Sequence, residues 1–250
     1  MRPRLRRWPH NDGMDIVRTA ELIVSASVSD RQGRVQLRSV ASFLADVAGD
    51  HAVELGFGRD ELRENRTWML SRLRIETTRW PRFGEVIRVR SWPSGMHGLF
   101  ALRDFELLDG AGERWGVAKT SWMVVDLELR RPARIPDTLG YLAGQCPPPV
   151  LDGFQKLKRP RSATGTEPIP VRWIDADMNG HANLACYVGW AVEAHDHAFL
   201  DSHEPVALHM EFRAEAQPGD MVSSVTDGVT QSLLRKSDGA ELARLRLEWR

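Results

Sequence analysis

Residues 171–193, VRWIDADMNGHANLACYVGWAVE, decide how the second half of this chain folds. The stretch begins as a short apolar strand, turns through residues 177–181 and continues as an apolar helix. The turn carries Asp177, Asn179 and His181, so a carboxylate, a carboxamide and an imidazole lie close together. Such a set can polarise a carbonyl and activate a water molecule. Read alone, D-x-N-x-H is more often a helix cap, because Asp and Asn satisfy the free N–H groups at a helix start.

The whole chain reads as one structural unit written twice. Each copy begins with a strand, turns, and continues through one amphipathic helix and several strands. Apolar residues at helical spacing predict helices over residues 35–55, which Gly56 ends, and 183–200. The strands expected after these helices cover residues 68–76, 85–92, 99–108 and 114–126 in the first copy, and 206–214, 221–229 and 241–249 in the second. Matching hairpin turns, with Gly at the position of positive φ, are expected at Asp109-Gly110 and Asp238-Gly239.

This order of elements predicts an α+β fold. A long helix with an antiparallel sheet of about five strands wrapped round it is the hotdog fold, in which one face of the sheet buries the helix. Two such units should pair through edge strands into one continuous sheet. The Pro- and Gly-rich segment 139–168 separates them as a linker. The expected domains are therefore an N-terminal hotdog over residues 14–138 and a C-terminal hotdog over residues 169–250.

The motifs of the second copy resemble those of the acyl-acyl-carrier-protein thioesterases, the family that releases fatty acids in plant plastids and many bacteria. The family pattern is close to D-x-D-x-N-x-H-x-N followed by Y-x-x-W. The corresponding residues here are Asp175, Asp177, Asn179, His181, Asn183, Tyr187 and Trp190. Residues 209–216, HMEFRAEA, are similar to the family's L-E-Y-R-R-E-C and put Glu215 at the acidic position.

The first copy carries further motifs of the same family in the same order. Residues 80–86, WPRFGEV, resemble its Y/W-P-x-W/F-G-D/E strand start, and residues 102–105, LRDF, resemble R-D-W/F. Residues 120–123, TSWM, are similar to T-S-x-W. Two positions depart from the family. Ala216 replaces the cysteine that follows the acidic residue in L-E-Y-R-R-E-C, so a thiol cannot act there. Residues 130–136 fall where the family has T-R-R-x-x-x-x-P, but Leu129 replaces the first Thr.

The resemblance implies a tandem double hotdog whose first copy binds the acyl chain and whose second copy carries the chemistry. It implies a catalytic set of Asp177, Asn179, His181 and Glu215. Glu215 and His181 would activate the attacking water, Asp177 would orient one of them, and Asn179 would bind the water or the thioester carbonyl. The N–H groups and dipole at the helix start would stabilise the oxyanion. Whether Glu215 or Asp177 is the base stays open.

Other polar residues of these motifs have plainer expected roles. Asp175 and Asn183 are expected to be turn and cap residues. Glu211 and Arg213 should face solvent, and Cys186 should be a small buried residue rather than a nucleophile. Five tryptophans are candidates for an acyl tunnel, with core packing the commoner role: Trp68, Trp80, Trp92, Trp115 and Trp122.

Composition excludes several classes of function. The 34 basic and 34 acidic residues give a formal net charge of zero, so no whole-protein field favours nucleic acid or an anionic membrane. No apolar run approaches the ~20 residues that span a bilayer, and no apolar segment follows the basic start, so we expect a cytoplasmic protein. The histidines lack metal-ligand spacing, and neither G-x-S-x-G nor a nucleotide fingerprint occurs. We therefore expect no metal and no cofactor.

The expected partner is acyl carrier protein, the small acidic domain that carries the substrate of the resembling family. The basic run Lys156, Lys158, Arg159 and Arg161 is a candidate docking site, and a solvated connecting loop is the plain alternative. The chain is expected to be a monomer or a homodimer.

Two other classes of function stay open at this stage. A hotdog protein can be a dehydratase or hydratase of acyl thioesters, which commonly pairs one His with an acid on the opposite subunit. It can also bind acyl groups without catalysis, but such a module has no need of a general base. The length of the acyl chain, and the choice between acyl carrier protein and coenzyme A thioesters, depend on side chains whose positions the sequence does not give.

Overall fold

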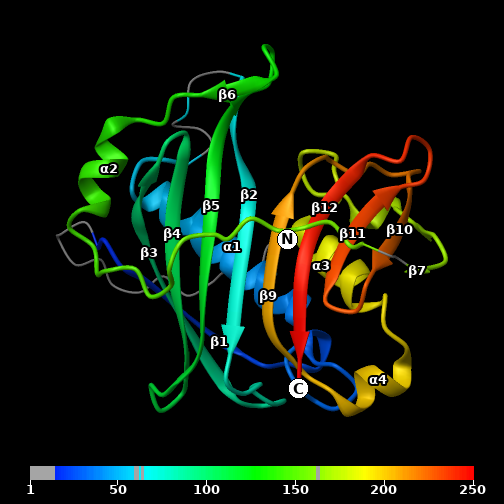
Figure 1. The fold of residues 1–250 in the computed structure, drawn as a ribbon. Coiled ribbons are helices and arrows are strands. Elements are labelled where there is room, and N and C mark those ends of the chain that lie inside the picture. The colour runs from blue at the N-terminus through cyan, green and yellow to red at the C-terminus, as the bar shows by residue number, and fades with distance from the viewer. Residues whose placement is uncertain (1–14, 59–61, 63–64, 162–163) are drawn as a thin grey trace.

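The computed structural model describes residues 15–58, 62, 65–161 and 164–250. Figure 1 shows one strongly curved sheet with helices α1 (Leu37–Glu54) and α3 (Leu184–Val192) on the same face. The described strands form a 12-stranded antiparallel sheet whose main order is β1-β3-β4-β5-β2-β9-β12-β11-β10-β7. This arrangement confirms the predicted α+β fold and the tandem repeat of a helix wrapped by a sheet. No helix within the described ranges is long and apolar enough to cross a membrane.

The first copy follows the predicted order of elements closely. Helix α1 lies inside the predicted range of residues 35–55, and Gly56 follows it at a φ of 75°. The hairpin at Asp109 forms, but the positive φ of 92° falls on Gly112 rather than on Gly110, because the turn is longer than two residues. The remaining elements of this copy are β1 (Arg18–Ile23), η1 (Ala26–Val28), β2 (Arg66–Thr77), β3 (Val86–His97), β4 (Phe100–Asp109), β5 (Arg114–Asp126), β6 (Arg131–Ala133) and α2 (Asp137–Ala143).

The second copy differs from the prediction in two elements. The single helix predicted over residues 183–200 is wrong: α3 ends at Val192, and α4 (His197–Ser202) starts anew because the Asp196 carboxylate accepts the Phe199 N–H at 2.8 Å. The strand predicted over residues 221–229 is too long, since Asp227 and Gly228 form a turn into an additional strand. The other elements are β7 (Thr164–Gly165), β8 (Ile169–Pro170), η2 (Trp173–Asp175), β9 (Pro205–Phe212), β10 (Met221–Thr226), β11 (Thr230–Arg235) and β12 (Glu241–Trp249).

The two copies join through β2 and β9, as predicted. These strands pair antiparallel from Arg72 opposite Glu211 to Glu76 opposite Ala207, with Arg74 facing His209 at the middle. Helices α1 and α3 contact each other on the inner face of the sheet and bury a shared apolar core that includes Leu44 and Val188. The joint therefore makes one continuous sheet and one continuous core.

Strand alternation explains the R-D pair of the first copy. Arg103 points to the helix side of β4, and Asp104 points to the outer side, where it pairs with Lys119 at 2.6 Å. The second oxygen of Asp104 accepts the N–H groups of Val150 at 2.9 Å and Leu151 at 3.3 Å. Asp104 therefore anchors the chain segment that connects the two copies.

The connecting segment crosses the outer face of the sheet, on the side away from α1 and α3 (Figure 1). Beyond Asp104, Arg74 on β2 donates to the carbonyl of Gly153 at 3.3 Å, and Arg244 on β12 donates to that of buried Leu157 at 3.1 Å. Because the connecting segment covers this face of the sheet, the prediction that Glu211 faces solvent is wrong. Glu211 is only 8% exposed and pairs with Arg213 at 2.9 Å instead of facing solvent.

Candidate active site

The turn between η2 and α3 holds the predicted catalytic residues in a compact loop. The Asp177 N–H donates to the His181 carbonyl at 2.8 Å, and the Gly180 N–H donates to the Asp177 carbonyl at 3.0 Å. The carboxylate of Asp177 accepts the Asn179 N–H at 2.7 Å. These bonds fix the loop from within and leave Asn179 exposed at its tip.

Glu215 reaches this loop from the chain that follows β9. The Ala182 N–H donates to the Ala216 carbonyl at 2.8 Å, which ties the loop to the chain beside Glu215. The His181 Nε2 then lies 3.2 Å from the Glu215 Oε2. The two side chains are 29% and 51% exposed, so water and a substrate can reach them. The structure thus brings together an imidazole and a carboxylate that are far apart in the sequence.

Asp177 contacts a different partner from the one expected. Its Oδ2 lies 3.4 Å from the Asn179 Nδ2, and within the described residues its carboxylate contacts neither His181 nor Glu215. The geometry therefore assigns Asp177 to holding the Asn179 backbone and carboxamide. The contact between an imidazole and a carboxylate at this site is therefore the one between His181 and Glu215.

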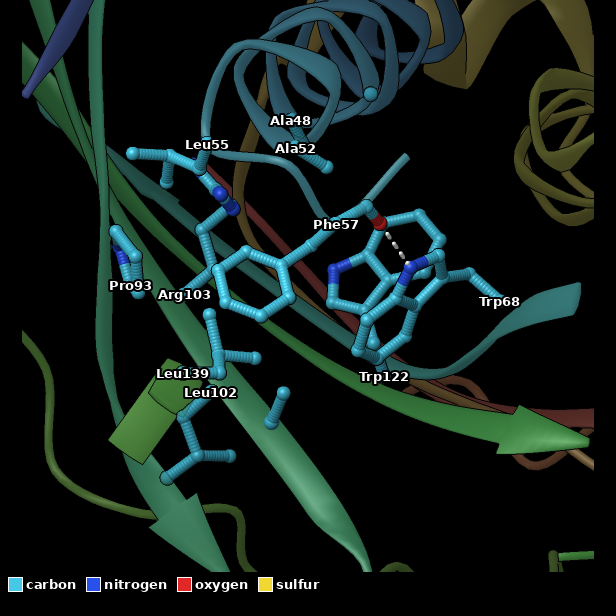
Figure 2. Close-up of a pocket in the computed structure, with 12 residues that line it drawn as sticks. Ala48, Ala52, Leu55, Phe57, Trp68, Pro93, Leu102, Arg103, Trp122 and Leu139 are labelled. Atoms are coloured by element: carbon cyan, nitrogen blue, oxygen red, sulfur yellow. Dashed lines mark hydrogen bonds between the residues drawn. The ribbon is translucent and has the colours of Figure 1, made fainter. Parts of the chain in front are cut away.

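An apolar pocket lies in the first copy, between α1 and strands β2 to β5 (Figure 2). Trp68 and Trp122 line it, and the Trp68 indole N–H donates to the Phe57 carbonyl at 2.7 Å. The other candidate tryptophans, Trp80, Trp92 and Trp115, are buried in or beside the core, as expected of most of them. The pocket is lined by Ala48, Gly49, Ala52, Leu55, Phe57, Trp68, Pro93, Ala101, Leu102, Arg103, Trp122 and Leu139.

The open space of this pocket is about 90 Å³. A cavity of about 150 Å³ is known to take up one benzene molecule. A long acyl chain would therefore require lining side chains such as Phe57 or Trp68 to move. The pocket belongs to the first copy, whereas His181 and Glu215 belong to the second.

A buried cation forms part of the pocket wall, which sequence reasoning did not foresee. The Arg103 Nη1 lies 2.9 Å from the His51 Nδ1 and donates to the Ser91 hydroxyl at 3.0 Å. The His51 Nε2 contacts the Asp15 carbonyl at 3.0 Å, so Nε2 carries the proton and Nδ1 accepts from Arg103. Burial, then the charge of Arg103, lowers the pKa of His51 to about 4. Burial lowers the pKa of Arg103 to about 10, which leaves it charged at neutral pH. Alternation along β4 was the signal that could have placed Arg103 here.

Sequence profiles of one known family match most of the chain. The acyl-ACP thioesterase N-terminal domain matches residues 17–141, and the C-terminal domain of the same family matches residues 158–250. The chain belongs to the acyl-ACP thioesterase family. The resemblance inferred from its motifs is thereby confirmed.

Individual members of the acyl-ACP thioesterase family show the same likeness. The chain is 30% identical over 217 residues to oleoyl-acyl carrier protein thioesterase 2 of Arabidopsis thaliana, with 78% of this chain and 58% of that protein covered. It is 31% identical to a palmitoyl-acyl carrier protein thioesterase of Gossypium hirsutum, with 78% and 53% covered. The chain thus spans a little over half the length of these curated relatives.

Solved structures of the family share the double hotdog. An acyl-ACP thioesterase from Bacteroides thetaiotaomicron superimposes with a TM-score of 0.84 at 25% identity, covering 94% of this chain and 98% of that one. A 12:0-ACP thioesterase from Umbellularia californica superimposes with a TM-score of 0.79 at 22% identity, covering 94% of each chain. The expected tandem double hotdog is confirmed.

Asn183 and Asp175 have the cap and turn roles expected of them, whereas Cys186, expected to be buried, is only half-buried. The Asn183 carboxamide caps α3 by accepting the Cys186 N–H at 3.2 Å. Asp175 accepts the Arg172 N–H at 2.7 Å and pairs with its guanidinium at 3.1 Å. Burial, then the negative charge of Asp175, raises the pKa of Cys186 to about 11. Cys186 is therefore a neutral thiol and a poor nucleophile at neutral pH.

Proposed function

We propose that this chain hydrolyses fatty acyl-acyl-carrier-protein thioesters to a free fatty acid and the carrier thiol. The observation that carries the proposal is the accessible contact of 3.2 Å between His181 and Glu215 at the mouth of α3. Membership in the acyl-ACP thioesterase family and the apolar pocket beside α1 support it. Asp177, Asn179, His181 and Glu215 are the proposed site residues.

In the proposed mechanism, water attacks the thioester carbonyl carbon directly. The His181–Glu215 pair takes one proton from that water as the new carbon–oxygen bond forms. The tetrahedral intermediate collapses with cleavage of the carbon–sulfur bond, and the pair returns the proton to the thiolate. The Asn179 carboxamide, oriented by Asp177, hydrogen-bonds the carbonyl oxygen or the water, while the N–H groups and dipole at the start of α3 favour the developing charge.

In the proposed division of labour, the first hotdog binds the acyl chain and the second carries out the hydrolysis. The pocket and the His181–Glu215 pair lie in different copies, in keeping with this division. The oligomeric state, a monomer or a homodimer, and the cytoplasmic location remain predictions from the sequence. The curated plant relatives are named as chloroplastic proteins.

The proposed partner is acyl carrier protein, and the basic run of the connecting segment is still a candidate docking site. Within it, Arg159 is paired with Glu241 at 3.3 Å, whereas Lys156 and Lys158 are exposed. Changing both lysines to Glu should raise KM for carrier-bound substrate and weaken its salt dependence, because exposed charges act over about 8–10 Å at physiological salt. A coenzyme A thioester should be much less affected. Equal losses on both substrates would assign the segment a structural role.

The test of the proposed function is an assay that separates the three candidate classes. Purified protein is incubated with acyl-carrier-protein and acyl-coenzyme A thioesters while thiol release is followed, and the acyl products are identified by mass spectrometry. Hydrolysis predicts one free thiol and one free fatty acid per turnover. A hydrated or dehydrated acyl group still attached to its carrier would indicate a hydratase or dehydratase. Binding without any product would indicate a non-catalytic protein.

A further inference from the structure

The first hotdog contains a turn with the same backbone hydrogen bonds as the turn that holds Asp177 and His181. The proposed catalytic residues Asn179 and His181 have no counterpart of the same type in it. In the first hotdog, the Asp30 N–H donates to the Arg34 carbonyl at 2.7 Å, and the Gly33 N–H donates to the Asp30 carbonyl at 3.0 Å. The Asp30 carboxylate accepts the Gln32 N–H at 2.9 Å. These bonds repeat, one for one, those made by Asp177, Gly180 and His181. The two turns can therefore be compared position by position.

The same comparison identifies the counterpart of Glu215. The Val35 N–H donates to the Pro81 carbonyl at 2.9 Å, as the Ala182 N–H donates to the Ala216 carbonyl at 2.8 Å. Pro81 therefore corresponds to Ala216. It follows that Trp80 stands where the second copy has Glu215.

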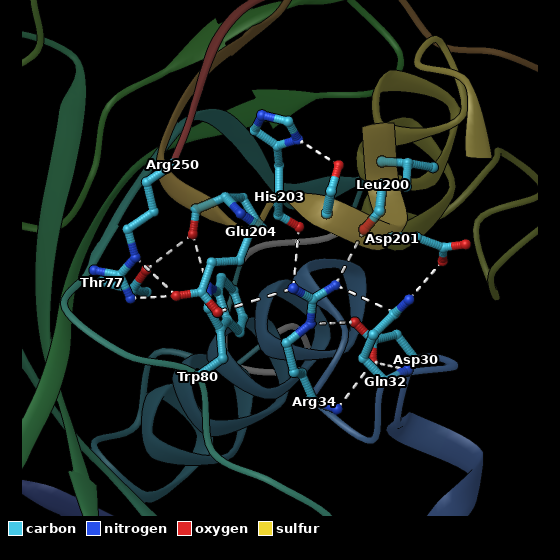
Figure 3. Close-up of polar contacts among 12 residues, drawn as sticks. Asp30, Gln32, Arg34, Thr77, Trp80, Leu200, Asp201, His203, Glu204 and Arg250 are labelled. Carbon is cyan, nitrogen blue, oxygen red and sulfur yellow. Dashed lines mark hydrogen bonds and ion pairs between the residues drawn. The ribbon is translucent and has the colours of Figure 1, made fainter. Parts of the chain in front are cut away.

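In the first copy these positions serve to hold the two hotdogs together (Figure 3). Arg34, at the position of His181, donates to the carbonyls of His203 at 3.0 Å and Leu200 at 3.3 Å near the end of α4. The Trp80 indole N–H donates to the Pro205 carbonyl at 2.6 Å. The first copy thus serves as an internal reference: it has the same backbone arrangement but no proposed catalytic side chains.

One buried hydroxyl distinguishes the catalytic copy from this reference. Counted from the caps Gln36 and Asn183, Val40 in α1 and Tyr187 in α3 hold the same helical position. The Tyr187 hydroxyl accepts the Ala216 N–H at 2.8 Å and donates to the Ala214 carbonyl at 3.3 Å. In the first copy Val40 has no hydroxyl, and the ring nitrogen of Pro81 has no hydrogen to donate. The double contact therefore occurs only where Glu215 is present.

The surroundings of Tyr187 make it a rigid anchor. Its side chain packs against Trp190 and Phe212 with ring centroids 5.2 and 5.4 Å apart, and the residue is only 4% exposed. Burial raises the pKa of Tyr187 to about 12, so the hydroxyl keeps its proton and can donate and accept together. Glu215, by contrast, is half exposed, so its place depends on the backbone that carries it.

We propose that Tyr187 is a positioning residue, whose hydroxyl holds the peptide groups on both sides of Glu215 and thereby sets the carboxylate against His181. The proposal rests on the proposed hydrolytic function of this pair. Because a displacement of about 1 Å can cost on the order of 100-fold in rate, a tether of the backbone is enough to control turnover.

The test compares two Tyr→Phe variants of the full chain. Tyr187→Phe keeps the ring and removes both hydrogen bonds, and Tyr141→Phe is the matched control at the only other tyrosine, which is 76% exposed. We expect Tyr187→Phe to lower kcat for thioester hydrolysis by about tenfold or more with KM changed less than about twofold. Tyr141→Phe should match the wild type. A wild-type kcat in folded Tyr187→Phe would overturn the proposal.

A double-variant experiment separates positioning from general support of the fold. In a Glu215→Ala background, Tyr187→Phe should lower the residual rate by less than about twofold, because the residue acts through Glu215. A loss as large as in the wild-type background would overturn the proposal. Absence of hydrolysis by the wild type would instead refute the proposed function itself.

A second variant keeps the test decisive if Tyr187→Phe does not fold. Ala216→Pro copies Pro81 of the first hotdog and removes the N–H that Tyr187 binds, without altering the tyrosine. It should lower kcat in the same direction, with the circular dichroism spectrum preserved. Unchanged kcat in this variant would overturn the role of the tether.

Discussion

His181 and Glu215 meet at 3.2 Å although they belong to separate segments, the turn before α3 and the chain after β9. A single backbone bond from the Ala182 N–H to the Ala216 carbonyl joins those segments next to both residues. The pair is therefore a product of the way the sheet and helix of the second hotdog pack. Among the ion pairs of the described residues it is the one that joins an imidazole to a carboxylate, whereas those that tie the sheet together use Arg or Lys.

Two asparagines near the pair should respond differently to substitution. Asn179→Ala should lower kcat with little change in KM, because its carboxamide, which contacts the Asp177 carboxylate at 3.4 Å, is proposed to act mainly in the transition state. Asn183→Ala removes the cap of α3 and should cost about 1 kcal/mol of stability. Steady-state kinetics and urea unfolding of both variants check this assignment. A rise in KM alone for Asn179→Ala would reduce that residue to a binding contact.

The pocket beside α1 makes a prediction about the acyl chain. Ala52→Leu adds carbon atoms to the pocket wall and should shift the released fatty acids toward shorter chains. Ala198→Leu, on the exposed surface of α4, is the control. The measurement is gas chromatography of the acids released from a mixture of acyl-carrier-protein substrates. An unchanged distribution with folded Ala52→Leu would mean that the chain binds elsewhere.

Buried histidines should make the fold sensitive to acid. Burial, complete for His51 and partial for His209, is the main cause that lowers the pKa of both side chains to about 4, from an ordinary value of 6.5. The unfolded chain therefore binds protons that the folded chain excludes, so stability is fully present above about pH 6.5 and is lost as pH falls toward 4. For fully buried His51 the loss is on the order of 3 kcal/mol.

Urea unfolding between pH 7 and pH 4.5 tests this dependence. His51→Gln keeps an acceptor for Arg103 but no longer titrates, so its free energy of unfolding should fall less steeply with pH than that of the wild type. His197→Gln, at an exposed position, should leave the slope unchanged. Identical slopes for His51→Gln and the wild type would contradict the buried neutral histidine.

Periodicity and turn signals were sufficient to predict the duplicated unit, the continuous sheet and the turn that holds Asp177, Asn179 and His181. They failed where local signals compete. The apolar spacing of residues 183–200 continues through the break before α4, and only the capping side chain of Asp196 marks the new helix. The Asp227-Gly228 turn was similarly hidden by the apolar residue that follows it.

Other features depend on contacts that no local pattern contains. Glu211 is buried because the connecting segment crosses the outer face of the sheet, and nothing in its own strand indicates that cover. Asp177 turns to Asn179 instead of His181 because the loop closes on itself. The tether from Tyr187 to the chain around Glu215 likewise became visible only when the two copies could be compared in space.

The most direct measurement is thiol release from an acyl-carrier-protein thioester by the His181→Ala and Glu215→Ala variants, beside controls at exposed His197 and Glu193. Loss of a general base typically costs about 10²–10⁴-fold, so both site variants should lose at least about 100-fold in kcat while keeping the thermal unfolding midpoint of the wild type. The His197→Ala and Glu193→Ala controls should keep full activity. Turnover at the wild-type rate by either folded site variant would contradict hydrolysis at the His181–Glu215 pair.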